Sequence, residues 1–210
     1  MVKVTIGSNG RIRIYVIDTE WLMLAGNRKL LIQLGFVDLL TGERVLDVTI
    51  DYGMSLEDLV QTLDMPDKLT HSAFHHSVMC GLRRFYGPQA TAATTMMPFA
   101  EIASKLSAMK LQNAIVIEHS TNYCDYEAIC NTFGKACMPP KTQALSTLPL
   151  LRDHAVPGMA SYSLPAIYPA FQPDPDLIYE HHIAIIDAEK LGHVMDVVLE
   201  NAKCFEKSGM

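Results

Sequence analysis

Two acidic residues, Asp18 and Glu20, stand two positions apart at the end of an apolar stretch of the chain. Side chains two apart on a β-strand project from the same face, so both carboxylates can reach one cation. Carboxylates this close repel each other, and their burial is costly unless a metal ion or a hydrogen-bond network compensates. The pair can hold a cation between its side chains, and a strand end that has simply reached solvent is the alternative.

Two aspartates fall on the apolar side of predicted helices. Apolar residues follow each of them at helical spacing: Leu191, Val194 and Val198 after Asp187, and Ile129 and Phe133 after Asp125. A charge on the inner face of a helix needs a partner, and a bound cation is one such partner. The alternative is an ordinary carboxylate at the first turn of each helix.

His182 lies five residues before Asp187, too far around a helix to share its face. We therefore expect His182 in the loop that enters the helix, where it can lie over a metal site. A histidine with a pKa near ~6.5 can accept a proton from water at neutral pH, which is the task of a general base. A surface or packing role is the alternative.

Apolar periodicity predicts the elements that position these residues. Strands are expected over 12–20, 29–37, 44–50 and 114–117, with a turn at Thr41-Gly42-Glu43 between the second and third. Helices are expected over 99–111, 125–136, 164–171 and 185–205, and 144–151 should be a strand or extended segment. The repeated succession of helix and strand favours an α/β fold.

Ser55 has the features of a helix N-cap, because acidic residues and then leucines follow it. Residues 68–85 could also form a helix, but Gly87-Pro88 and a run of small residues interrupt the pattern. We expect one domain over 1–210, with an insertion-like region at about 65–98 whose structure the sequence does not assign.

Composition supports one compact globular unit, since 49% of the 210 residues are hydrophobic and 19% are charged. The formal net charge of −6 excludes a surface that is basic throughout, although it permits a local basic groove. Two divalent cations would offset four of the negative charges.

The five cysteines form no closely spaced CxxC pair, which favours free thiols in a reducing compartment. The first residues lack the continuous apolar stretch of a signal peptide, and no segment approaches the ~20 apolar residues of a membrane span. We expect an intracellular protein, cytoplasmic or nuclear, that contacts no membrane. His71 and His75 have a metal-compatible spacing, but no acidic or cysteine partner nearby supports a zinc site.

Several segments, in chain order, resemble motifs of the DEDDh family of 3′-to-5′ exonucleases. Residues 182–188 read His-Ile-Ala-Ile-Ile-Asp-Ala, where the family has His-x-Ala-x-x-Asp. Residues 17–20 read Ile-Asp-Thr-Glu and resemble the Asp-x-Glu strand, and residues 32–35 read Ile-Gln-Leu-Gly, as the next strand of the family commonly does.

The region between these motifs is also similar to the family. Residues 117–125 resemble the middle motif, which ends on an aspartate, with Cys124 in the place of the usual aromatic residue. Thr147-Leu148 and Tyr162-Ser163-Leu164 resemble segments found between the middle and last motifs. The resemblance spans roughly residues 14–198, apart from the region at 65–98.

The resemblance implies a ribonuclease H-like fold, a five-stranded mixed sheet flanked by helices. It implies that two Mg²⁺ or Mn²⁺ ions are held by four carboxylates: Asp18, Glu20, Asp125 and Asp187. His182 would accept the proton of the attacking water. The substrate would be the 3′ end of RNA or DNA, in single-stranded form, and the products nucleoside 5′-monophosphates.

The resemblance also places Thr19, Trp21 and Leu22 beside the terminal nucleotide. Stacking on tryptophan is worth about 1 to 3 kcal/mol per base, although a lone tryptophan also suits a core. Residues 83–86, Arg-Arg-Phe-Tyr, form a basic and aromatic cluster that could guide the strand, with a solvated helix end as the alternative.

Two other functions remain compatible with the sequence. The chain could be a catalytically silent exonuclease-fold module that binds nucleic acid or protein, or a phosphodiesterase that acts on small nucleotides. All five active-site residue types of the family are present, which favours turnover.

Overall fold

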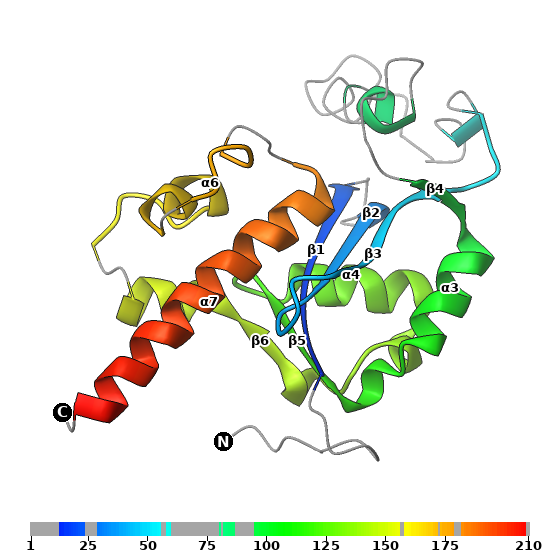
Figure 1. Ribbon diagram of the computed structural model, residues 1–210. Coiled ribbons are helices and arrows are strands. Elements are labelled where there is room, and N and C mark those ends of the chain that lie inside the picture. The colour runs from blue at the N-terminus through cyan, green and yellow to red at the C-terminus, as the bar shows by residue number, and fades with distance from the viewer. Residues whose placement is uncertain are drawn as a thin grey trace.

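The computed structural model describes residues 13–23, 29–55, 58–59, 80, 82–86, 95–155, 158–171, 173–178 and 182–208. In this part of the chain, a six-stranded mixed sheet with the order β4-β3-β2-β1-β5-β6 lies between helices (Figure 1). The strands are β1 (Arg13–Met23), β2 (Lys29–Asp38), β3 (Arg44–Asp51), β4 (Thr95–Pro98), β5 (Ala114–Glu118) and β6 (Ala144–Ser146). No helix among the described residues is long and apolar enough to cross a membrane.

The first three strands form the antiparallel meander that the sequence predicts. β5 then pairs with β1 in parallel, with Val16 opposite Ile117, and β6 continues the sheet in parallel beyond β5. The parallel pairing brings the carboxyl ends of β1 and β5 to the same edge of the sheet. Asp18 and Glu20 therefore lie near the residues that follow β5.

β1 is buried on both faces, as its double apolar pattern predicts. Tyr15 and Ile17 belong to the core beneath α3 (Phe99–Ala108) and α4 (Cys124–Phe133), whereas Val16 belongs to the core beneath α7 (Ala184–Ser208). Figure 1 shows α7 running across one face of the sheet, with α3 and α4 away from it. By the alternation of the strand, Asp18 and Glu20 lie on the α7 side.

Several short elements complete the described fold. They are α5 (Thr147–Leu150), α6 (Leu164–Ile167), a π-helical turn (Leu151–Ala155) and single 3-10 turns at Leu111–Asn113, Lys135–Cys137, Lys141–Gln143 and Tyr168–Ala170. The structure confirms the α/β class and the predicted helices at 99–111, 125–136 and 185–205, with shifted ends. The N-cap at Ser55 is also confirmed, because its hydroxyl oxygen accepts the N–H of Asp58 at 3.1 Å.

Two details differ from expectation. The sheet has six strands instead of five, because β4, inside the unassigned region at 65–98, pairs in parallel with β3. The strand or extended segment expected over 144–151 ends at Ser146 and gives way to α5, where the hydroxyl of Thr147 donates to the backbone oxygen of Glu118 at 3.2 Å. Of the helix considered at 68–85, the structure describes helical residues at 80 and 82–86, and the remainder lies outside the described residues.

Gly35 and Gln33 of β2 allow α7 to begin against the sheet. A Cβ atom at residue 35 would lie 2.5 Å from the backbone carbon of Ala184 and from the nitrogen of Ile185. The side-chain oxygen of Gln33 accepts the N–H of Ala184 at 3.3 Å, while its amide donates to the Thr49 hydroxyl at 3.0 Å. One unbonded N–H of the helix start is thus satisfied by the neighbouring strand.

We predict that Gly35→Ala displaces the start of α7 and lowers the free energy of unfolding by about 1 to 3 kcal/mol, the usual cost of overpacking. Gly192→Ala in the same helix is the matched control, because its new Cβ would lie 3.9 Å from Val16, an ordinary contact. That change should leave the protein as stable or stabilise it by up to about 1 kcal/mol. Urea unfolding followed by circular dichroism measures both; equal stability of the two variants would contradict the proposed role of Gly35.

Candidate active site

A cleft of about 360 Å³ opens at the edge of the sheet where β1 ends. It is lined by residues from β1, from the segment after β5, from α4 and from the start of α7: Asp18, Thr19, Glu20, Trp21, His119, Ser120, Cys124, Asp125, His182 and Asp187. The structure thus brings together all the residues for which the sequence predicts a role in metal binding or catalysis. Of the three predicted substrate contacts, Leu22 is not part of the lining.

The carboxylates from β1 are electrostatically strained. Burial, and then the charges of Asp125, Asp187, Glu20 and Glu118, raise the pKa of Asp18 well above its ordinary value of 3.8. Burial and the charge of Asp187 raise the pKa of Glu20 from 4.5 to about 7, against an opposing effect of Arg84. Several negative charges share one poorly solvated corner, which is the condition that bound cations relieve.

Asp125 lies in the first turn of α4 and is oriented by β1. The hydroxyl of Thr19 donates to its Oδ1 at 2.6 Å, across more than a hundred residues of sequence. Burial raises the pKa of Asp125 to about 6, and the Thr19 hydrogen bond and the Lys29 charge act in the opposite direction. Thr19 points to the α4 face of β1, where its hydroxyl holds the carboxylate of Asp125. The sequence analysis predicts a contact between Thr19 and the substrate instead.

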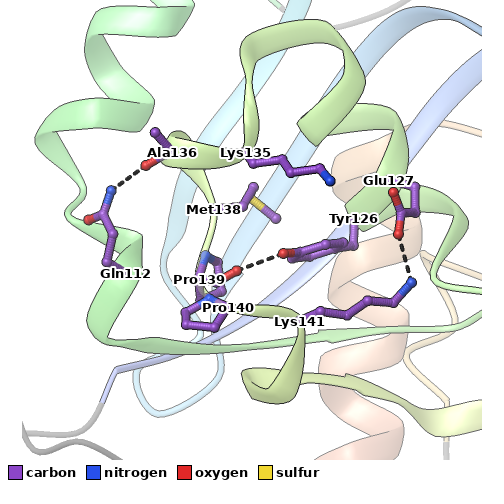
Figure 2. A pocket seen from close by; sticks show the side chains of 9 residues that line it. All are labelled: Gln112, Tyr126, Glu127, Lys135, Ala136, Met138, Pro139, Pro140 and Lys141. Atoms are coloured by element: carbon purple, nitrogen blue, oxygen red, sulfur yellow. Dashed lines mark hydrogen bonds and ion pairs between the residues drawn. The ribbon is translucent and has the colours of Figure 1, made fainter.

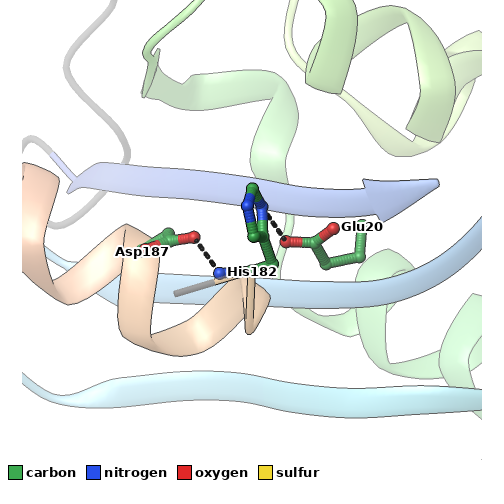
Figure 3. A group of neighbouring side chains, drawn as sticks. All are labelled: Glu20, His182 and Asp187. Carbon is green, nitrogen blue, oxygen red and sulfur yellow. Dashed lines mark hydrogen bonds and ion pairs between the residues drawn. The ribbon is translucent and has the colours of Figure 1, made fainter. Parts of the chain in front are cut away.

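Asp187 and His182 are held together at the start of α7. The backbone N–H of His182 donates to Asp187 Oδ2 at 2.9 Å, and His182 adopts a left-handed backbone with φ 58°. Figure 3 shows the imidazole beside Glu20, with Nδ1 3.9 Å from Glu20 Oε1. The His182 side chain is 69% exposed, so water and substrate can reach it. The expected position in the loop before the helix is confirmed.

Trp21 is covered on one face by a lysine. The ammonium of Lys29 lies 4.0 Å from the centre of the Trp21 ring and 3.4 Å from the backbone oxygen of Cys124. The ring also packs against the core, as the core alternative predicts, and it lines the cleft. This cation–π contact fixes a positive charge close to Asp125 at the rim of the cleft.

The basic and aromatic cluster at 83–86 has two aromatic residues anchored in the fold and two exposed arginines, of which Arg84 lies 5.4 Å from the centre of the Phe85 ring. Phe85 is buried, and the hydroxyl of Tyr86 donates to the backbone oxygen of Ile50 at 2.9 Å. Arg83 and Arg84 are exposed. Because the charge of Arg84 lowers the pKa of Glu20, the cluster lies close enough to act on the cleft.

Glu118, at the end of β5, is a buried carboxylate for which the sequence analysis assigned no role. Its oxygens accept the hydroxyl of Ser120 and, at 2.7 Å, the backbone N–H of Tyr126. Burial and the charge of Asp125 raise its pKa from 4.5 to about 7. Glu118 thus secures the first turn of α4, which carries Asp125. An acidic residue that ends an apolar strand was the signal, as it was for Asp18.

His119 was also missed, although it joins three of the segments that resemble the family. Its Nδ1 lies 2.7 Å from the hydroxyl of Thr147, and its Nε2 donates to the backbone oxygen of Tyr162 at 2.6 Å. Burial lowers the pKa of His119, which favours the neutral ring. The histidine therefore holds the wall of the cleft in place.

A second cavity, of about 450 Å³, is lined by residues of α4 and of the segment 135–141, together with Gln112 (Figure 2). The hydroxyl of Tyr126, one of the lining residues, donates to the backbone oxygen of Pro139 at 2.7 Å. Its one carboxylate, from Glu127, is paired with Lys141 at 2.6 Å. Since Lys135 is the other charged residue of its lining, this cavity offers no cluster of ligands for a hard cation.

The residues of the first cleft fit divalent cations. One ligand atom each from Glu20, His182 and Asp187 lie within 4.8 Å of one another. Asp18 and Asp125 add carboxylates on the same cleft, and oxygen-rich ligand sets favour Mg²⁺ and Mn²⁺ over softer metals. Burial and neighbouring negative charges raise the pKa values of Asp18 and Glu20, so a bound cation would stabilise the ionised form of both carboxylates.

No family model and no curated protein matches this chain. Among solved structures, it is similar to the Neurospora crassa Pan2 catalytic unit, described as a protease and nuclease domain, with a TM-score of 0.53 and 14% sequence identity. The fold is ribonuclease H-like. The similarity covers 99% of this chain and 30% of that one, so this chain spans less than a third of its neighbour.

We predict that the metal-free protein becomes less stable as the pH rises from about 5 to about 8. Because the pKa of Glu20 is raised from 4.5 to about 7, the folded protein retains a proton that the unfolded chain releases within this range. The associated stability is present below pH 4.5 and is lost as the pH rises through 7.

Glu20→Gln should therefore show a shallower decline than the parent in melting temperature measured in EDTA across this range. Glu101→Gln, which removes an exposed carboxylate on α3, is the control and should follow the parent. The comparison is made between variants because His119, with a lowered pKa, contributes in the opposite direction. Parallel pH profiles for all three proteins would contradict the assigned strain at Glu20.

Proposed function

We propose that this protein is a metal-dependent 3′-to-5′ exonuclease that hydrolyses phosphodiester bonds of RNA or DNA and releases nucleoside 5′-monophosphates. The observation that carries the proposal is the convergence of Asp18, Glu20, Asp125 and Asp187 with His182 on one cleft. The ribonuclease H-like fold supports a nuclease, and the order of the motifs supports the direction and the products.

Four carboxylates would hold the divalent cations: Asp18, Glu20, Asp125 and Asp187. When bound, such ions would supply positive charge to the scissile phosphate and lower the pKa of a bound water. Thr19 keeps Asp125 turned toward the cleft through its 2.6 Å hydrogen bond. The backbone N–H of His182 does the same for Asp187.

His182 would accept the proton of the attacking water. Its side chain is 69% exposed and its Nδ1 lies 3.9 Å from Glu20 Oε1, so a water molecule in the cleft can reach the ring. His182 has a left-handed backbone that is bonded to Asp187, and its ring lies beside Glu20.

The nucleic-acid strand would enter the cleft past two basic side chains at its rim. Lys29, held over Trp21, and Arg84, on the Glu20 side, can each contact a backbone phosphate. Trp21 and Leu22 would lie beside the terminal nucleotide. We propose a single strand as the form of the substrate that enters this cleft.

The test is incubation of the protein with 3′-labelled and 5′-labelled RNA and DNA in Mg²⁺, Mn²⁺ or EDTA. We expect 5′-labelled strands to shorten stepwise and 3′-labelled strands to release labelled mononucleotide at once. EDTA should abolish both, and added Mn²⁺ should restore them. Asp18→Asn should abolish cleavage while raising the melting temperature in EDTA, because it removes a repelling charge. Cleavage that persists in EDTA would exclude the mechanism.

The same assay separates the rival functions. A silent binding module would retain labelled strands without shortening them in any metal, and a small-nucleotide phosphodiesterase would cleave dinucleotides but not longer strands. Glu101→Gln should match the parent in every arm, since that exposed residue lies on α3, away from the cleft lining.

We predict that His182→Ala slows single-turnover cleavage by about 10² to 10⁴ while strand binding is kept, the usual effect of removing a positioned base. His181→Ala is the matched control, since His181 lies outside the described residues and outside the motif, and it should cleave at the parent rate. Rapid-quench measurements on one labelled strand decide the matter. An equal loss in both variants, or a loss at His181 alone, would show that the base is misassigned.

A further inference from the structure

Lys190 is a lysine with no exposed side-chain surface, one turn along α7 from Asp187. No other lysine or arginine among the residues of assigned burial is buried. An ammonium group removed from water is costly unless an opposite charge compensates, so its position requires a partner.

Asp187 is that partner. The ammonium of Lys190 donates to Asp187 Oδ1 at 3.3 Å and lies 5.8 Å from the centre of the Tyr168 ring. The other oxygen of Asp187, Oδ2, accepts the N–H of His182. Both carboxylate oxygens therefore have donors within the protein, one neutral and one positively charged.

The location of this positive charge distinguishes it from an ordinary ion pair. Asp187 is one of the four carboxylates whose charges raise the pKa of Asp18. Among the charges that shift the pKa of Glu20, that of Asp187 has the largest influence. A cation bonded to Asp187 from the helix side reduces the net negative charge of the cleft. It also repels any other cation that approaches the same carboxylate.

We propose that Lys190 is a built-in counter-cation of the metal site, whose charge beside Asp187 lowers the affinity of the site for divalent ions. The inference rests on the proposed use of metal by this cleft. It assigns to Lys190 a positioning role, since the residue touches a ligand and not the substrate.

The role has a consequence of definite sign. If Lys190 only supported the fold, its removal would disorder Asp187 and weaken metal binding. If it is a counter-cation, its removal increases the negative charge of the cleft and tightens metal binding, while the metal-free protein loses stability. The two readings therefore predict opposite changes in the dissociation constant.

The experiment is a calorimetric titration of Mn²⁺ into the parent, Lys190→Met and Lys190→Gln at one pH. Glutamine retains an N–H donor for Asp187 without the positive charge. Lys190→Gln therefore tests the inference even if Lys190→Met does not fold. We expect at least one Mn²⁺ ion to bind about tenfold more tightly, or better, in the variants, as loss of one nearby positive charge implies. Lys105→Met, an exposed lysine on α3 with the same charge change, should bind as the parent does.

Thermal unfolding supplies the second measurement. The variants should melt below the parent in EDTA, and saturating Mn²⁺ should remove most of that difference. Unchanged or weaker Mn²⁺ binding in both variants would overturn the inference and leave the proposed function intact. A parent protein that binds no Mn²⁺ would overturn the proposed function and this inference together.

Discussion

Mutual repulsion among carboxylates is the constraint on which this structure depends. Burial and four neighbouring carboxylates raise the pKa of Asp18, and Glu20 and Glu118 both titrate near 7 for related reasons. A corner of this kind tends to open or to retain protons unless donors and cations oppose the repulsion. Much of the surrounding architecture supplies that opposition.

The opposing contacts come from separate elements of the fold. Thr19 of β1 donates to Asp125, and backbone N–H groups donate to Glu118 and Asp187. α7 places Asp187 at the cleft because Gly35 leaves room for the first turn of this helix and Gln33 accepts the N–H of Ala184 at its start. The α/β framework therefore fixes where each charge lies, and bound cations would complete the balance.

Much of this arrangement follows from periodicity within single elements. Alternation in β1 places Asp18 and Glu20 on one face, and helical spacing places Asp187 toward the sheet, so the sequence predicts these positions. The α/β class follows from the order of the elements. The extra strand β4 was not predicted, since four residues in an unassigned region carry too short a pattern.

Contacts between distant elements could not be predicted in this way. The Thr19 bond to Asp125 and the Lys29 charge beside it join residues about a hundred positions apart, and no spacing rule relates them. Glu118 ends an apolar strand, as Asp18 does at β1, but the motif in which it stands assigns no role to it. From the sequence, Lys190 is expected to be an ordinary exposed polar residue of a helix. Only the structure shows that its side chain is buried.

The central claim is that this cleft holds two hard cations between four carboxylates. Anomalous diffraction from crystals soaked in Mn²⁺ tests it most directly. The account predicts two peaks ~3.5 to 4 Å apart within the cleft, with oxygen ligands from Asp18, Glu20, Asp125 and Asp187 and with His182 uncoordinated. A cleft without peaks, or a single peak coordinated by His182 together with Glu20 and Asp187, would contradict it.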